Sequence, residues 1–184
     1  MRGISQNVLD SVGYSELIPG HHKFPRISTY GECVGHTIYT PAKERKYDHT
    51  VYEAYKGNHY LYNEEVLPTL FYGKGVILVE GIFDCLSLVQ AGLPCVAALT
   101  NSLSYRHLEK LKRYTDTVIF WHDSDTHGEQ GYLRTCKKAD EIGGLNITAY
   151  SNNNAKDSND LMTNNPQSFV EATNILKEIL SVPR

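Results

Sequence analysis

From residue 75 onward, short apolar runs alternate with longer segments of helical periodicity. The apolar runs are rich in β-branched and aromatic residues, which predicts strands buried on both faces. These runs are residues 75–80, 95–100, 117–123 and 146–151. The other segments space apolar residues three and four positions apart, as helices do, and they are residues 83–93, 105–114, 129–142 and 166–180. Strands that alternate with such helices need crossover connections, so we expect an α/β fold with a mainly parallel four-stranded sheet flanked by helices.

The first 72 residues lack this alternation. A short helix is expected at residues 6–12, and two β-like runs within residues 23–40, KFPRIS and CVGHTIYT, predict a β-hairpin. Residues 41–49, PAKERKYDH, are polar and basic and predict a loop. We therefore expect two domains, a small α+β subdomain over residues 1–72 and an α/β domain over residues 73–184.

The chain of 184 residues is 41% hydrophobic and has a formal net charge of −3, which is typical of a globular protein without a general basic surface for nucleic acid. Residues 75–184 hold 13 acidic and 10 basic residues, so this part suits a polyanion poorly unless its carboxylates hold metal ions. No apolar run approaches the roughly 20 residues that span a bilayer, and the N-terminus lacks the apolar core of a signal peptide. We expect no membrane partner and a cytoplasmic location.

The four cysteines, Cys33, Cys85, Cys95 and Cys136, form neither a CxxC motif nor the close spacing of a zinc knuckle. We interpret them as small apolar residues in a reducing compartment. The sequence therefore predicts no structural zinc.

Acidic residues follow three of the four predicted strands, whose carboxyl ends meet at one edge of a parallel sheet. They are Glu80 after the first strand, with Asp84 in the next helical turn, Asp123 and Asp125 after the third strand, and Asp157 and Asp160 after the fourth. Aspartates at i and i+2 in an extended segment project to the same side, so both can reach one ion. Because clustered carboxylates repel one another and prefer hard cations, these acids predict a Mg²⁺ site.

Two other metal sites fit parts of the segment FWHDSDTHGEQG, residues 120–131. DSDTHG begins like an EF-hand loop, but Arg134 occupies the twelfth position, where a bidentate glutamate is required. His122 and His127 could join the aspartates in a zinc site, although oxygen ligands dominate and His122 should point away from Asp123. Each acid alone could also be a helix cap or part of a solvated turn.

The segment from VILVEGIFDCL to FWHDSDTHG resembles the Toprim core of bacterial DnaG-type primases and phage primases. That family carries an E-G motif after one strand, D-x-D after another, and a further acidic motif downstream. The matching residues are Glu80-Gly81 with Asp84, Asp123 with Asp125, and Asp157 with Asp160 in KDSNDLM. Upstream, the hairpin, the KY pair in ERKYDHT and the segment YKGNHYLYN are also similar to primases, so the resemblance covers about residues 20–163.

The chain departs from the family pattern at three positions. Tyr39 stands where the hairpin usually carries an arginine, His49 where an asparagine follows the KY pair, and Ser124 where D-x-D usually has glycine. The resemblance also implies a compact form that lacks zinc-binding and helicase domains, as suits a phage whose primase functions are divided among separate proteins. If a phage encodes the protein, we expect it in the cytoplasm of the host.

By this resemblance, the chain is the RNA-polymerase domain of a DNA primase, a nucleotidyltransferase. The resemblance implies Mg²⁺-dependent synthesis of short RNA primers on single-stranded DNA from ribonucleoside triphosphates during DNA replication, with Mn²⁺ able to replace Mg²⁺. It also implies a replicative helicase, or a separate zinc-binding initiation protein, as a partner.

The resemblance assigns roles to the residues that match the motifs. Glu80, Asp123 and Asp125 are expected to hold the catalytic Mg²⁺. Asp84, Asp157 and Asp160 are expected to support a second ion or the nucleotide. The residues expected to contact nucleotide or nucleic acid are Lys43, Arg45, Lys46, Tyr47, Lys56, Gly81 and Lys156.

Two other functions are compatible with parts of the sequence. A Toprim nuclease would use the same acids to cut phosphodiesters, although it has no need of the KY and KGNHYLY segments. A non-catalytic nucleic-acid-binding subunit of a replication complex is the third hypothesis. Seven of the 13 tyrosines lie between Tyr30 and Tyr62 and could stack on bases, although core packing explains many such rings.

Overall fold

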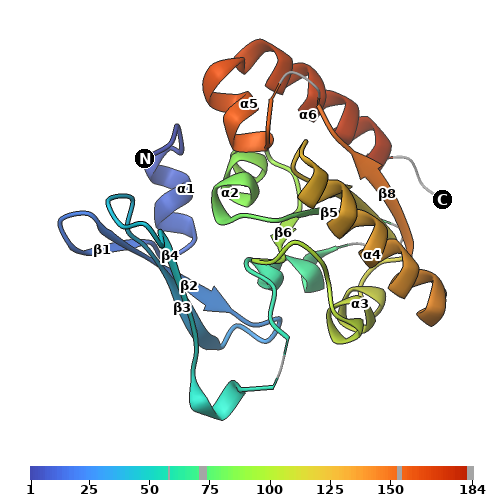
Figure 1. The fold of residues 1–184 in the computed structure, drawn as a ribbon, viewed down its shortest axis with the longest axis horizontal. Helices are drawn as coiled ribbons and strands as arrows, with labels where there is room; N and C mark the ends of the chain where they lie inside the picture. Colours follow the sequence, from blue (N-terminus) through green and yellow to red (C-terminus); the bar gives the residue numbers. More distant parts are fainter. Residues whose placement is uncertain (58, 71–73, 153–154, 182–184) are drawn as a thin grey trace.

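The computed structural model describes residues 1–57, 59–70, 74–152 and 155–181. Its second half contains a four-stranded parallel sheet in the order β6-β5-β7-β8 (Figure 1). The strands are β5 (Val76–Val79), β6 (Cys95–Ala97), β7 (Thr117–Trp121) and β8 (Asn146–Tyr150). The predicted α/β fold with a parallel four-stranded sheet is confirmed.

Helices cover both faces of this sheet. They are α2 (Ile82–Gln90), α3 (Tyr105–Lys112), α4 (Thr126–Ile142), α5 (Ser158–Asn164) and α6 (Pro166–Ser181). Alternate residues of the strands join two separate hydrophobic clusters, because successive side chains of a strand point to opposite faces. Ile77 packs in the cluster that contains residues of α2, α5 and α6, whereas Leu78 packs in the cluster that contains residues of α3 and α4.

The first half forms a second, antiparallel sheet in the order β1-β2-β3-β4. Its elements are α1 (Gln6–Ser11), β1 (Ser15–Ile18), β2 (His21–Ile27), β3 (Cys33–Tyr39) and β4 (Tyr47–Val51), followed by the short 3-10 helices η1 (Glu53–Tyr55) and η2 (Glu64–Thr69). The predicted hairpin and first helix are confirmed. The prediction of a loop over residues 41–49 is wrong from Tyr47 onward, because Tyr47 begins strand β4, which pairs with β3.

The two sheets are joined by aromatic packing. Phe83 of α2 lies edge-on to Phe24 and Tyr39 of the N-terminal sheet, with ring centroids 5.7 and 4.9 Å apart. Tyr62 also forms an isolated antiparallel bridge with Ala97 of β6. The domain boundary expected between residues 72 and 73 stays a prediction, since residues 71–73 lie outside the described part of the chain.

Two boundaries near Asp123 and Asp125 differ from the expected ones. Strand β7 ends at Trp121 rather than residue 123, and α4 begins at Thr126 rather than residue 129. The reason for the earlier start is Asp125, whose side chain accepts hydrogen bonds from the backbone amides of His127 and Gly128 and so caps the helix. Asp157 caps α5, a helix that was not predicted, in the same way.

The cysteines only partly follow their predicted role as buried apolar residues. Cys85 and Cys95 are buried in the core, whereas Cys33 is exposed and Cys136 is half-buried. Within the described residues, no helix is both long and apolar enough to cross a membrane.

Candidate functional site

A cavity of about 430 Å³ opens at the carboxyl edge of the parallel sheet, where it meets the N-terminal sheet. It is lined by residues that follow β5, β6, β7 and β8 and by the start of β4. Eight of the predicted site residues line it: Lys46, Tyr47, Glu80, Gly81, Asp84, Asp123, Lys156 and Asp157. Segments far apart in the sequence therefore bring most of the predicted acids together with the KY pair.

Glu80 follows β5 directly, and its buried Oε1 atom has no hydrogen-bond partner among the described residues. Burial, and then the charge of Asp123, raises the pKa of Glu80 to about 7. An unpaired buried carboxylate oxygen is costly unless a cation or donor faces it. Glu80 is therefore suited to a bound cation.

Asp84 lies in the first turn of α2 and is held by the start of α5. Its Oδ1 atom accepts a hydrogen bond from the backbone amide of Asn159 at 3.1 Å. Burial, followed by the nearby charge of Asp157, raises the pKa of Asp84 to about 8. A Cβ atom on Gly81 would lie 2.5 Å from Asp84 Oδ2, so the glycine makes room for this carboxylate.

Asp123 and Asp125 both face the amine of Lys156. Its Nζ atom lies 3.2 Å from Asp123 Oδ2 and 3.8 Å from Asp125 Oδ2. The hydrogen bond with Asp123 raises the pKa of Lys156, while burial raises that of Asp123. Backbone donation, first from Gly128, lowers the pKa of Asp125, which lines a neighbouring cavity with His122.

Two glycines in the first turns of α4 allow close packing around the D-x-D segment. A Cβ atom on Gly128 would lie 2.3 Å from the backbone oxygen of Asp123, and one on Gly131 would lie 1.7 Å from that of Asn101. The loop after β6 and the segment after β7 are thus pressed against the same helix. Close packing therefore accounts for the two glycines in the segment DTHGEQG.

The oxygen donors of these acids suit a hard divalent cation, although in the described residues they are not yet gathered around one point. Among the described residues, no three His, Cys, Asp or Glu side chains are grouped closely enough to hold a metal ion. The unpartnered Oε1 of Glu80 and the shared orientation of Asp123 and Asp125 nevertheless supply oxygen donors of the kind that Mg²⁺ prefers. Lys156 supplies the positive charge between the two aspartates here.

The remaining predicted residues lie outside this cavity. Asp160 accepts hydrogen bonds from the Lys156 backbone amide and from the Asn164 side chain, so its role within this fold is to hold the 156–164 segment. Lys43 and Arg45 line an adjacent surface cavity with Lys46. Lys56 is exposed and pairs with Glu53.

The two histidines beside the D-x-D segment, His122 and His127, lie outside the cavity that contains Glu80. His122 stacks on Tyr132, at 5.5 Å between ring centroids, and its Nδ1 lies 2.8 Å from the backbone oxygen of Asp123. His127 is exposed in the first turn of α4.

Sequence reasoning missed Arg2. Its guanidinium lies 4.6 Å from the ring centroid of Phe83 and 5.1 Å from that of Tyr39, and it lines the cavity with the acids. Asn159, which also holds Asp84, donates a hydrogen bond to the backbone oxygen of Arg2 at 3.0 Å. No local pattern in the sequence marks this residue, because its place at the cavity depends on contacts with residues far away in the chain.

Parts of the chain are similar in sequence to known proteins. A family model described as Toprim-like matches residues 77–162. The DNA primase of Clostridium acetobutylicum is 41% identical over 63 residues, which cover 34% of this chain and 11% of that protein. The DNA primase of Rickettsia bellii is 42% identical over 81 residues, which cover 43% of this chain and 14% of that protein. The matched segments are thus a small part of these relatives.

Solved structures match over nearly the whole chain. A DnaG catalytic core has a TM-score of 0.78 and 19% identity, with 95% of this chain and 70% of that chain covered. The primase fragment of the bacteriophage T7 primase-helicase protein has a TM-score of 0.70 and 17% identity, with 94% and 70% covered. At such identities the likeness concerns the fold. Residues 77–162 thus match a Toprim-like family model, and the chain combines the fold of DnaG-type primase catalytic cores with local sequence similarity to DNA primases.

Proposed function

We propose that this chain is the catalytic core of a DNA primase, which synthesises short RNA primers on single-stranded DNA from ribonucleoside triphosphates. One observation carries the proposal: acids that follow three parallel strands share a cavity with Lys46 and Tyr47 of the N-terminal sheet. Carboxylates that hold a cation, opposite basic side chains, suit a triphosphate. Sequence similarity to curated DNA primases supports the same function.

The proposed reaction is nucleotidyl transfer. The 3′-oxygen of one nucleotide bonds to the α-phosphorus of the next, the bond to pyrophosphate breaks, and the hydroxyl proton passes to water. Bound Mg²⁺ would neutralise the charge that develops on the phosphate and orient its oxygens. Mn²⁺ would serve the same purpose.

Glu80, Asp123 and Asp125 would hold this ion. Glu80 contributes the carboxylate oxygen that has no partner in the described residues, and Asp123 contributes one that faces Lys156. Lys156 would exchange its contact with Asp123 for one with a phosphate, since an exposed lysine can reorient at small cost. Asp84 and Asp157 would support a second ion or the nucleotide.

The facing side of the cavity would bind the triphosphate. Lys46 provides a point charge, and Arg2 provides a planar guanidinium that is fixed by its stacking on Tyr39 and Phe83. Lys43 and Arg45, on the adjacent surface, would contact the phosphate backbone of the strand. Arg2 thus offers the positive charge that the hairpin lacks at Tyr39.

Partners follow from the same proposal. The similar T7 fragment belongs to a protein named as a primase-helicase, and a similar Aquifex aeolicus structure contains zinc-binding and RNA polymerase domains. We expect this core to cooperate with a helicase, or with a zinc-binding initiation protein, in the cytoplasm.

The direct test incubates the pure protein with single-stranded DNA, all four ribonucleotides, one of them labelled, and Mg²⁺ or Mn²⁺. Labelled RNA of discrete short lengths is the expected product. Loss of the DNA instead would identify a Toprim nuclease. Retained DNA binding without any product, even with a helicase present, would favour the non-catalytic subunit.

A further inference from the structure

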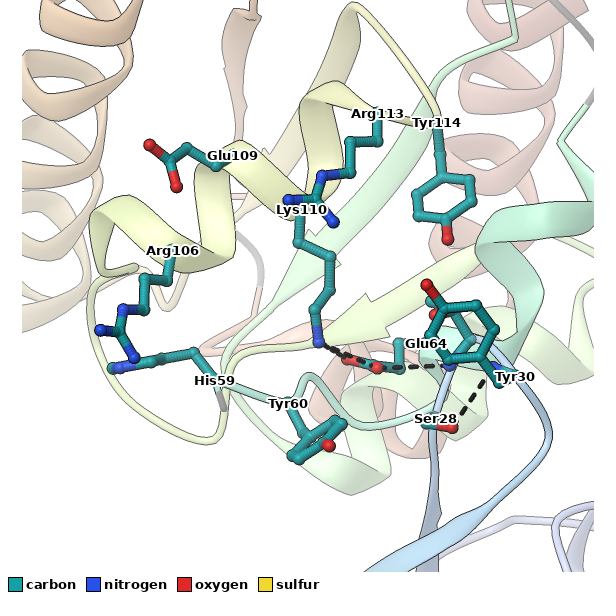
Figure 2. Close-up of a pocket in the computed structure, with 11 residues that line it drawn as sticks. Ser28, Tyr30, His59, Tyr60, Glu64, Arg106, Glu109, Lys110, Arg113 and Tyr114 are labelled. Atoms are coloured by element: carbon teal, nitrogen blue, oxygen red, sulfur yellow. Dashed lines mark hydrogen bonds and ion pairs between the residues drawn. The ribbon is translucent and has the colours of Figure 1, made fainter. Parts of the chain in front are cut away.

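A second cavity, of about 410 Å³, lies apart from the acids that follow the parallel strands (Figure 2). Three segments enclose it: the turn between β2 and β3, the segment from His59 to Glu64, and helix α3. None of the carboxylates assigned to Mg²⁺ lines it. Its own acids and bases therefore decide what it can bind.

The floor of this cavity is a buried ion pair. Glu64 is fully buried and accepts hydrogen bonds from the backbone amide of Leu61 and from Lys110, both at 2.8 Å. Lys110 Nζ also lies 4.5 Å from the ring centroid of Tyr60. Glu64 thus neutralises the charge of Lys110, so this ion pair shapes the floor of the cavity and adds no net charge to it.

Two guanidinium groups above this floor, opposed by the single exposed carboxylate of Glu109, give the rim a net positive charge. Arg106 and Arg113 extend from α3 on either side of Lys110 (Figure 2). Arg106 uses one N–H group on the backbone oxygen of Gly57 and keeps other donors available. In the described part of the chain, no hydrogen bond or ion pair involves the guanidinium of Arg113, which is exposed. Such groups suit phosphate oxygens.

Aromatic rings border the same cavity. Tyr30 is 82% exposed, so folding gains little from its ring. The turn that carries Tyr30 is nevertheless ordered, because Ser28 Oγ accepts hydrogen bonds from the backbone amides of Tyr30 and Glu32. Tyr60 and Tyr114 add rings from the other two segments. An exposed ring on a fixed turn beside free guanidinium donors is the combination that binds bases and phosphates of single strands.

We propose that this cavity binds a nucleotide unit of single-stranded nucleic acid, with a base stacked on Tyr30 and a phosphate held by Arg106 and Arg113. The inference rests on the proposed priming function, which needs a template strand. The loop after β6 links the two cavities: Asn101 lines the acidic one, and Ser104 Oγ lies 3.0 Å from Nδ1 of His59 in this one. A strand bound here would leave the acidic cavity to the incoming nucleotide.

The test measures fluorescence anisotropy of a labelled oligodeoxythymidylate in EDTA, where no synthesis occurs. Tyr30→Ala and Arg113→Ala should each weaken binding about fivefold or more, the lower end of the cost of losing a stacked base. Tyr30→Phe, which keeps the ring, and Arg134→Ala, which removes an exposed arginine elsewhere, should bind like the parent. Circular dichroism checks that each variant is folded.

Parent-like DNA affinity in both Tyr30→Ala and Arg113→Ala would overturn the inference, as would a parent chain that does not bind the oligonucleotide. Weaker binding of fluorescent ATP with unchanged DNA binding would also overturn it, because the cavity would then take a free nucleotide. If the variants lose DNA binding while the parent makes no RNA, the strand site stands and the proposed priming function fails.

Discussion

The Nζ atom of Lys156 lies 3.2 Å from Oδ2 of Asp123, so a cation of the protein itself stands beside a carboxylate that we assign to Mg²⁺. Asp123, Asp125 and Glu80 would repel one another without it. Lys156 and a divalent cation would therefore compete for the same oxygens. The ion pair of Lys156 with Asp123 should therefore stabilise the metal-free protein and weaken its binding of Mg²⁺.

Lys156→Ala should lower the free energy of unfolding in EDTA by up to about 1 kcal/mol, since partly exposed ion pairs contribute little more. Added Mg²⁺ should then raise the melting temperature of the variant more than that of the parent, because the carboxylates have lost their other cation. Lys177→Ala, an exposed lysine on α6, is the matched control. Equal melting temperatures for both variants, with and without Mg²⁺, would contradict this competition.

Gly128→Ala should disturb the metal site through the backbone. The added Cβ atom would lie 2.3 Å from the backbone oxygen of Asp123, so either α4 or the D-x-D segment must shift. Overpacking of this kind costs about 1–3 kcal/mol. We expect a lower melting temperature and a loss of RNA synthesis. Gln130→Ala, at an exposed position of the same turn, should change neither, and a similar effect of both substitutions would rule out the close contact as the cause.

Arg2→Ala should raise the KM for ribonucleotides by about 10- to 100-fold, the usual cost of losing a hydrogen bond to a charged group. Arg2→Lys should recover part of the loss, since lysine keeps the charge without the planar fork. Arg134→Ala controls for a general change in charge. Steady-state kinetics in varied ribonucleotide supply the measurement, and a KM within about twofold of the parent would remove Arg2 from the site.

Glu65 should make stability depend on pH. Burial raises its pKa to about 7, and within the described part of the chain its buried Oε2 atom has no hydrogen-bond partner. Because the folded pKa lies above the unfolded one, the stabilising contribution is complete below the unfolded pKa, near 4.3, and is lost as pH rises through about 7.

Glu65→Gln should therefore raise the free energy of unfolding by about 1–2 kcal/mol at about pH 8 and change it little at about pH 4. Urea unfolding at both pH values measures this. Glu178→Gln, on an exposed glutamate of α6, should show no such pH-dependent gain. A gain from Glu65→Gln that is equal at both pH values would show that the carboxyl group stays in one protonation state.

The sequence predicted those features that depend on local patterns. The four strands of the parallel sheet and the helices α2, α3, α4 and α6 follow hydrophobic periodicity, whereas the short helix α5 was not predicted. Strand β4 was missed because Tyr47–Val51 is a polar edge strand whose partner, β3, determines its conformation. Local patterns cannot report such pairing.

The acids of the site were predictable from their place after strand ends, whereas Lys46 and Tyr47 were predicted only by the resemblance. Glu80 and Asp123 lie in one cavity because parallel strands end at one edge. Asp125 lies after the same strand as Asp123, but its role as a helix cap depends on where α4 begins. Arg2 reaches the cavity through contacts with Tyr39, Phe83 and Asn159, all distant in the sequence.

RNA synthesis by Asp123→Asn, compared with Asp140→Asn, tests the central claim most directly. Both variants lose one carboxylate charge, but Asp140 is exposed on α4 and lies outside the cavity. We predict that the parent and Asp140→Asn make Mg²⁺-dependent short RNA on single-stranded DNA, and that Asp123→Asn makes at least about a hundredfold less. RNA synthesis by Asp123→Asn at the parent rate would contradict the assignment of this cavity as the catalytic site.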